Sequence, residues 1–342
     1  MAAHPHIQFM ALAESGALEA QAVLLCESLR AFGGKYADAP ITVVSPRKSR
    51  RPSTATLREL DRLDVEFIAA DLPSPCPEYG TSFRVRAAAF VARHGTAPFL
   101  AQLDSDTLFL RAPEFSFDNA DVLARPVDAK GICTSGSGDA QDAYWRELCD
   151  LCGVAYEALP WVTTSVDRQR VRANYNGGLI LARRSCGIFE KTEEIFLRLV
   201  GAGRRSHLTP AQPMRIGSGT VSPEGITYWG TGQVALALAC TAVGARTEVL
   251  PDTYNVPLHS FDDIHSPAAH PVHVHYHWLC EPAALAANPL LDGRLSLPPA
   301  QLRWLRERLP LGVRRESSTR SWFARMRQRS TALMRSMRGN EG

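Results

Sequence analysis

The stretch PFLAQLDSDTLFL, residues 98–110, consists of an apolar run, two aspartates and a second apolar run. Residues 99–103 predict a strand buried on both faces, as in the centre of a mainly parallel sheet. Asp104 and Asp106 follow this strand directly, and open α/β sheets bind ligands at the carboxyl ends of their strands. The two carboxylates flank Ser105 and can converge on one cation, although a strand-end turn capped by Asp104 is the plain alternative.

Strands and helices alternate before this stretch. Apolar runs predict strands over 6–13, 41–45 and 65–69, and helical spacing predicts helices over 18–32, 57–63 and 82–94. This order indicates an α/β fold with a mainly parallel central sheet, right-handed crossovers and helices on both faces. Neither the fingerprint GxGxxG nor the loop GxxxxGKS/T occurs in this half, so a metal on the two aspartates is the natural way to hold a diphosphate.

Composition and charge are those of a folded protein. The 342 residues are 45% hydrophobic and 21% charged, which is ordinary for a globular chain. The net charge is +3, but residues 312–342 carry eight arginines against two glutamates, which leaves −3 for the rest. A mildly acidic body with a basic tail argues against a general nucleic-acid binder.

The cysteines and the N-terminus favour a cytoplasmic protein. The eight cysteines are scattered, and the single CxxC pair, Cys149 and Cys152, lies in a helical pattern typical of buried thiols rather than a metal site. Residues 1–16 lack a basic region followed by an apolar core, and the longest apolar run, 234–245, is too short to cross a membrane. We therefore expect reduced thiols, no signal peptide and no transmembrane helix.

Two later stretches carry polar side chains suited to a site. In YNGGLIL, residues 175–181, Asn176 and two glycines precede an apolar run, so that the backbone could approach a ligand closely or simply turn. In PVHVHYHW, residues 271–278, strict alternation predicts a strand with three histidines on one face, at least one of them a metal ligand. Between them, residues 201–225 form a Gly/Pro/Ser-rich span long enough for a lid or binding element.

Taken together, the DSD after a strand, the NGG, Gln233 at the start of an apolar helix and the late HYH resemble the nucleotide-sugar-dependent glycosyltransferases of the GT-A fold. The resemblance covers residues 6–290 and is nearest to glycosyltransferase family eight, the glycogenin and galactosyltransferase-like group. It implies a metal-dependent hexosyltransferase that retains configuration at the anomeric carbon and uses a nucleoside-diphosphate sugar, with a UDP-sugar as the first expectation. The acceptor would be a glycan, a lipid or a protein.

The resemblance also assigns roles to individual residues. Asp104 and Asp106, with Ser105 between them, match the DxD metal and donor site, and His275 matches the late metal-binding histidine. The remaining implied contacts are a basic residue beside the donor, two residues lining the sugar and a glutamine on the reacting face: Arg84, Asn176, Gly177 and Gln233. Two carboxylates and an imidazole suit Mn²⁺ better than Mg²⁺, so we expect Mn²⁺ on Asp104, Asp106 and His275, with His277 as the substitute ligand.

The chain departs from the family pattern at two places. Gly232 stands where the family has Asp, which puts the sugar and acceptor contacts in question. After His275 the chain reads YHWLCEPAAL, without the glycine and lysine that bind the diphosphate in the family. Two other functions therefore stay open: a metal-dependent phosphoesterase, and a non-catalytic protein that binds a sugar or nucleotide.

The expected organisation is one GT-A-type catalytic domain over 1–310, with a donor-binding half over about 1–125 and a metal-completing and acceptor half over about 126–300. Residues 311–342 form a basic tail in which apolar residues recur among arginines at near-helical spacing. An amphipathic helix on the inner face of an anionic membrane is one interpretation, and a solvated tail or a subunit contact is the other. No specific nucleic-acid partner is expected.

Overall fold

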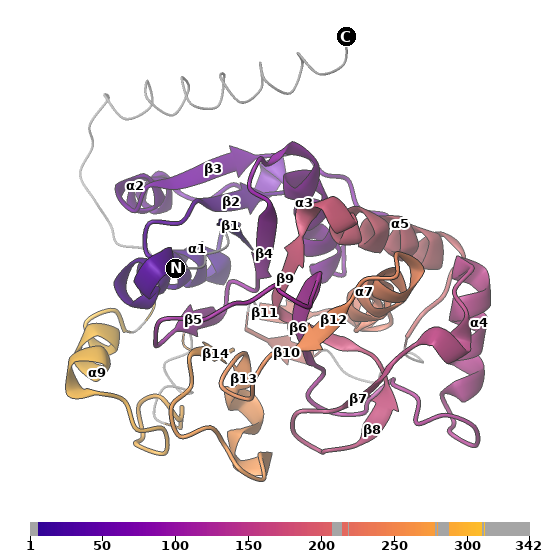
Figure 1. The fold of residues 1–342 in the computed structure, drawn as a ribbon. Coiled ribbons are helices and arrows are strands. Elements are labelled where there is room, and N and C mark those ends of the chain that lie inside the picture. The colour runs from indigo at the N-terminus through magenta and orange to yellow at the C-terminus, as the bar shows by residue number, and fades with distance from the viewer. Residues whose placement is uncertain are drawn as a thin grey trace.

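A computed structural model describes residues 6–206, 214–217, 219–277, 279, 287–309 and 311, so the predicted tail lies outside the described residues except for its first one. A seven-stranded sheet forms the centre of the molecule (Figure 1). In spatial order its strands are β12 (Thr247–Val249), β6 (Val122–Pro126), β9 (Tyr175–Arg183), β4 (Phe99–Leu103), β1 (Ile7–Leu12), β2 (Ile41–Ser45) and β3 (Val65–Ala69). All neighbours pair in parallel except β9, which is antiparallel to β4 and β6. The prediction of a mainly parallel α/β sheet is confirmed.

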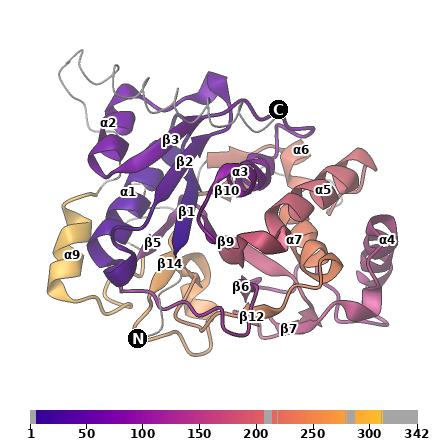
Figure 2. The same cartoon turned by 45° about the horizontal axis from the view of Figure 1, so that its top comes forward.

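Helices cover both faces of this sheet, as the sequence predicted (Figure 2). One face carries α1 (Ala17–Phe32) and α2 (Thr54–Arg62), and the other carries α3 (Thr81–His94), α5 (Ile188–Gly201) and α7 (Thr231–Ala242). The alternation of a strand explains the two cores: in β1, Phe9 packs on the α1 side and Met10 on the α3 side. Both side chains are fully buried, so β1 lies in the middle layer.

A small second sheet brings the late histidines to the end of β4. After the DSD turn the chain continues into β5 (Thr107–Phe109), which pairs antiparallel with β14 (His273–His275), and β14 pairs in parallel with β13 (Val256–Pro257). The predicted strand over 271–278 is shorter than expected, because His277 has a φ of +59° and leaves the extended conformation. The expectation that all three histidines alternate along one strand is therefore wrong for His277.

The remaining elements lie outside the central sheet. They are α4 (Asp142–Cys152), the hairpin of β7 (Trp161–Thr163) and β8 (Arg170–Arg172), the hairpin of β10 (Met214–Ile216) and β11 (Gly219–Val221), α6 (Pro223–Ile226) and α9 (Pro299–Arg306). Cys149 and Cys152 are buried free thiols in α4, and burial raises the pKa of both. Among the described residues, none of the helices combines the length and the apolar character needed to cross a bilayer.

Candidate metal and donor site

The two aspartates of the DSD turn face different partners. The carboxylate of Asp104 forms an ion pair with Arg84 of α3, whose side chain is only 11% exposed. Burial alone would lower the pKa of this guanidinium, but the charge and hydrogen bond of Asp104, together with Tyr79 and Asp106, raise it overall. The backbone N–H of Asp104 donates to the carbonyl of Gly178 at 3.1 Å, which joins the end of β4 to β9. The ion pair of Arg84 and Asp104 forms one wall of the site.

Asp106 belongs to a cluster with His275 and His277. One ligand atom from each of the three residues lies within 4.8 Å of the others. His275 Nε2 is 3.2 Å from Asp106 Oδ1, and the rings of His275 and His277 stack with centroids 4.0 Å apart. Although burial raises the pKa of Asp106, the two imidazoles lower it to about 2. In turn, Asp106 raises the pKa of His275 against the effect of burial.

The third histidine of the stretch is part of the core. His273 is fully buried with its ring 4.7 Å from the ring of Phe109, and burial lowers its pKa to about 3. His277 instead turns back through its left-handed backbone, so that its Nδ1 lies 3.2 Å from the carbonyl oxygen of His275. Burial lowers the pKa of His277 well below its usual value, which favours the neutral, ligating imidazole.

Glycines allow three segments to meet around this cluster. A Cβ on Gly177 would overlap the guanidinium of Arg84, and one on Gly178 would overlap Asn255 Oδ1 and approach His275 Nδ1 to 2.9 Å. A Cβ on Gly217, between β10 and β11, would overlap the carboxylate of Asp106. The β10–β11 turn therefore lies directly over the cluster, within the long 201–225 span that was expected to act as a lid or binding element.

Asn176 does not point a free amide into the site. Its Nδ2 donates to Asp128 Oδ2 at 3.0 Å, and its Oδ1 accepts from the backbone N–H of Gly178 at 2.9 Å. Asp128 also accepts from the Ser165 hydroxyl at 2.9 Å, and burial raises its pKa. Sequence reasoning missed Asp128, although it follows a buried strand as the DSD aspartates do.

Two further residues near the cluster were not predicted. Asn255 is 2% exposed, has a φ of +49°, and neither of its side-chain polar atoms has a hydrogen-bond partner among the described residues. The ring of His259 meets the ring of His277 edge-on at 4.2 Å, and burial lowers the pKa of His259. No sequence pattern predicts either residue, because Asn255 lies just before β13 and His259 lies in the short helical segment just after it.

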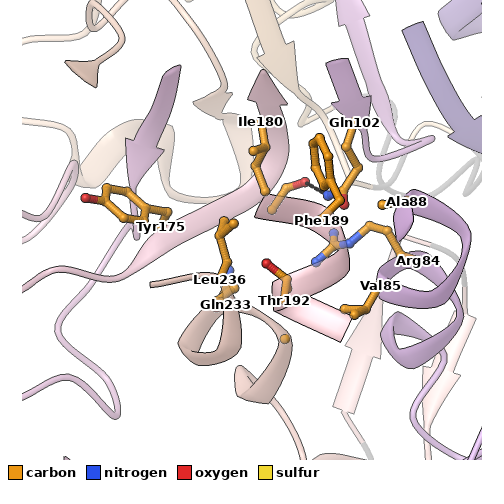
Figure 3. Close-up of a pocket in the computed structure, with 12 residues that line it drawn as sticks. Arg84, Val85, Ala88, Gln102, Tyr175, Ile180, Phe189, Thr192, Gln233 and Leu236 are labelled. Carbon is orange, nitrogen blue, oxygen red and sulfur yellow. Dashed lines mark hydrogen bonds between the residues drawn. The ribbon is translucent and has the colours of Figure 1, made fainter. Parts of the chain in front are cut away.

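Ser105 and Gln233, the two remaining predicted site residues, have different surroundings. The Ser105 hydroxyl donates to the carbonyl of Leu12 at 2.6 Å, which ties the DSD turn to the end of β1. Gln233 lines a cavity of about 10 Å³ together with Arg84 and Gly177 (Figure 3). That volume suits about one water molecule, and Arg84 Nε is a buried donor with no partner among the described residues.

The first departure from the family pattern has a packing reason. A Cβ on Gly232 would lie 3.2 Å from Val85 Cγ2 and 3.7 Å from Thr81 Cγ2, both in α3. The start of α7 therefore lies close to α3, and a side chain at this position would require Val85 to shift by a few tenths of an ångström. Gly232 is thus a contact residue between helices here, and any polar contact that an aspartate would provide has to come from another residue.

The chemistry of the donor set fits a divalent cation. A carboxylate oxygen and two imidazole nitrogens converge from two different segments, and His275 Nδ1 is a buried polar atom with no partner among the described residues. Such mixed oxygen and nitrogen ligands suit Mn²⁺ and related transition metals. Asp104 lies outside this set of three, since its carboxylate is paired with Arg84.

Comparisons with known proteins give one family match and several similar solved structures. The profile of a family described as the Rhodobacterales glycosyltransferase domain matches residues 9–209, and comparison with curated proteins gives no match. Among solved structures, the chain is similar to apo mouse xyloside xylosyltransferase 1, at 15% identity and a TM-score of 0.41, over 80% of this chain and 97% of that one. It is similar to the galactosyltransferase LgtC in complex with donor and acceptor sugar analogs, at 12% identity and a TM-score of 0.45, over 87% of this chain and 99% of that one. It is also similar to the bifunctional glycosyltransferase WbbM in its apo structure, at 11% identity and a TM-score of 0.45, over 81% of this chain and 46% of that one.

Proposed function

The chain belongs to the Rhodobacterales glycosyltransferase domain family, and we propose that it transfers a sugar from a nucleoside-diphosphate sugar to an acceptor hydroxyl with the help of a divalent metal. The observation that carries this proposal is the convergence of Asp106, His275 and His277 at the carboxyl end of β4. A UDP-sugar is the donor we would test first, and membership of family eight, with retention at the anomeric carbon, is part of the proposal.

The metal site would consist of Asp106, His275 and His277, with Mn²⁺ preferred over Mg²⁺ because two of the three ligands are imidazoles. When bound, the cation supplies positive charge to the oxygens of the leaving diphosphate. Asp104 was also expected to bind the metal, and its pairing with Arg84 supports a contact with the donor instead. The chain has no counterpart of the family's diphosphate lysine, so Arg84 is the basic group that we place beside the donor.

The other predicted residues would shape the sugar pocket. Asn176 orients the carboxylate of Asp128, and Gly177 lets Arg84 reach the strand. Gln233 faces the same small cavity as Arg84, and we keep it as the residue on the reacting face. In the transfer, the acceptor oxygen bonds to the anomeric carbon, the bond from that carbon to the diphosphate breaks, and the acceptor hydroxyl gives its proton to the carboxylate of Asp128. Burial raises the pKa of Asp128, which suits a proton acceptor.

Calorimetric titration with UDP, GDP and their common sugar conjugates, each with and without Mn²⁺, tests the proposal. We expect one nucleotide to bind only when the metal is present. Asp106→Asn should weaken this metal-dependent binding by about a hundredfold or more, because it removes a ligand rather than an outer contact. The matched control is Asp118→Asn, an exposed carboxylate that bonds only to its neighbour Ser116 among the described residues.

Three results would contradict the proposal. Metal-independent binding, or metal-dependent binding that survives Asp106→Asn, would refute the assignment of the metal site. Release of phosphate from the nucleotide with water as the sole acceptor would favour the phosphoesterase. If the metal-dependent binding holds, NMR of the product anomer then decides whether configuration is retained.

A further inference from the structure

An open groove with a volume of about 360 Å³ lies beside the β7–β8 hairpin. The end of β6 and the segment after β12 form its other walls, and Arg125, Trp161, Arg168, Arg170 and Val249 are among its lining residues. This volume falls in the range of about 300–1,000 Å³ that is typical of small-molecule sites. The groove is thus large enough to hold one or two sugar rings, which the small cavity beside Arg84 is not.

Two exposed hydrophobic side chains line this groove. Across the described residues, three large hydrophobic side chains are markedly exposed: Trp161 at 39%, Val243 at 38% and Val249 at 45%. Two of the three line this one groove. Tryptophan is a costly side chain to leave in water, and an exposed indole at a groove commonly serves as a contact surface for a ligand.

Positive charge accompanies the indole. Arg168 and Arg170 are exposed, and neither has a carboxylate within ion-pair distance among the described residues. The guanidinium of Arg170 lies 4.9 Å from the centre of the Trp161 ring, which restrains it without neutralising it. Arg125, by contrast, is already paired with Asp252. The groove therefore presents two uncompensated guanidinium groups beside an aromatic ring.

The groove adjoins the chain segment that leads to Asp128. Arg125 and Pro126 line the groove, and Asp128 follows them at the site. Ser165, in the turn between β7 and β8, donates to Asp128, and the backbone N–H of Ser165 donates to the carbonyl of Val127 at 3.0 Å. The hairpin is thus attached to the segment that carries the proposed reacting carboxylate.

We propose that this groove binds the acceptor, and that the bound part of the acceptor is a sugar that carries a carboxylate or a phosphate. Its identification as an acceptor site rests on the proposed transferase function. Arg168 and Arg170 would bind the anionic group, because guanidinium forms paired hydrogen bonds with both kinds of anion, and Trp161 would contact the sugar ring. A neutral sugar would leave both arginines without a partner.

Titration of the full chain by NMR or calorimetry with four probes tests this inference. The probes are a glucuronate-containing disaccharide, glucose 6-phosphate, neutral maltose and single-stranded hexathymidylate. We expect one anionic sugar to bind at least about tenfold more tightly than maltose, and the two anionic probes distinguish a carboxylate from a phosphate. The double variant R168Q/R170Q should weaken this binding by about tenfold or more, since it removes both charge-assisted contacts.

Control variants keep the interpretation specific. Trp161→Phe should retain most of the affinity and Trp161→Ala should lose it, because the ring and not the indole nitrogen makes the contact. Arg303→Gln removes an exposed arginine from α9 and should leave every titration unchanged. Circular dichroism of each variant checks that the hairpin change has not unfolded the protein.

The inference fails if neither anionic sugar binds, or if maltose binds as tightly as they do. It also fails if R168Q/R170Q binds the anionic sugar as tightly as the parent chain, or if hexathymidylate binds to the groove more tightly than the anionic sugars. The Mn²⁺-dependent nucleotide titration is run on the same samples, so that the two proposals can fail separately. If the anionic sugar binds in the groove but no nucleotide binds, the transferase proposal fails and the groove remains a sugar-acid or sugar-phosphate site.

Discussion

The metal cluster and the hairpin groove are neighbouring regions that handle charge in opposite ways. In the cluster, Asp106 is surrounded by the imidazoles of His275 and His277, and the nearby Arg84 is paired with Asp104. These side chains are largely buried, and all except Arg84, which belongs to α3, come from strands of the two sheets or their ends. In the groove, Arg168 and Arg170 are exposed and carry no such compensation among the described residues.

This contrast separates a preformed site from a site completed by its ligand. A buried charge has to be paired within the protein, because an unpaired one costs several kcal/mol, so the cluster is assembled before any donor arrives. An exposed guanidinium pays no such penalty and can wait for an external anion. In the proposed function, rigid strands thus hold the cluster that binds the diphosphate, which is common to all donors. The hairpin presents the surface that recognises the acceptor, which varies between enzymes.

Gly178→Ala should have the largest effect, because it acts where the strands hold the cluster together. Its Cβ would overlap Asn255 Oδ1 and lie 2.9 Å from His275 Nδ1, and β9 cannot shift since it pairs with strands on both sides. We expect a loss of about 1–3 kcal/mol in the free energy of unfolding, together with loss of Mn²⁺ binding. Urea denaturation and a metal titration measure the two effects.

The control for this substitution is Gly201→Ala at the end of α5, where an added Cβ meets nothing within 4 Å. It should leave both stability and Mn²⁺ binding within about 0.5 kcal/mol of the parent chain. Full Mn²⁺ affinity in Gly178→Ala would show that the cluster can rearrange and is not preformed.

Two double-mutant cycles compare the ion pairs of the two regions directly. The side chains of Arg84 and Asp104 are 11% and 21% exposed, whereas those of Arg172 and Glu157, beside the groove, are 8% and 71% exposed. We expect a coupling energy of about 2 kcal/mol from Arg84→Met with Asp104→Asn, because water screens this pair poorly. The cycle of Arg172→Met with Glu157→Gln should give less than about 1 kcal/mol. Urea denaturation of the six variants provides both values, and equal couplings would remove the distinction between the regions.

The sequence predicted the scaffold well where burial alone decides the structure. The bounds of β2, β3 and β4 agree with the predicted runs. Every residue of β2 and β4 is buried, so both faces favour apolar residues, whereas β3 is the edge strand and buries mainly Val65 and Phe67. Asp104 and Asp106 were placed at the end of β4 for the same reason. Asp128 could have been found by the same argument, since it follows the buried strand β6.

Other parts of the site depend on tertiary contacts that no local pattern encodes. The alternation of PVHVHYHW placed His277 on a strand, but its positive φ turns the ring onto His275. The resemblance placed both Arg84 and Asp104 at the donor site, but no local pattern predicted the ion pair between them, because the two residues are 20 positions apart. No local pattern predicted Trp161 or Arg170 as site residues, because β7 and β8 are only three residues long each.

The smallest expected effect concerns a side-chain hydrogen bond between the hairpin and the segment after β6, from the Ser165 hydroxyl to Asp128 at 2.9 Å. Ser165→Ala should reduce the free energy of unfolding by about 1 kcal/mol, as for an ordinary hydrogen bond, and Ser116→Ala, which removes an exposed hydroxyl–carboxylate bond, should cost less. Backbone bonds from Ser165 to Val127 and from Val166 to Asp128 remain, so the groove should keep its shape. We therefore expect Mn²⁺-dependent nucleotide binding to stay within about twofold, and the losses from Ser165→Ala and Gly178→Ala to add within about 0.5 kcal/mol. Loss of nucleotide binding in Ser165→Ala, measured by the same calorimetry, would mean that the hairpin holds the reacting carboxylate in place and that the two regions act as one unit.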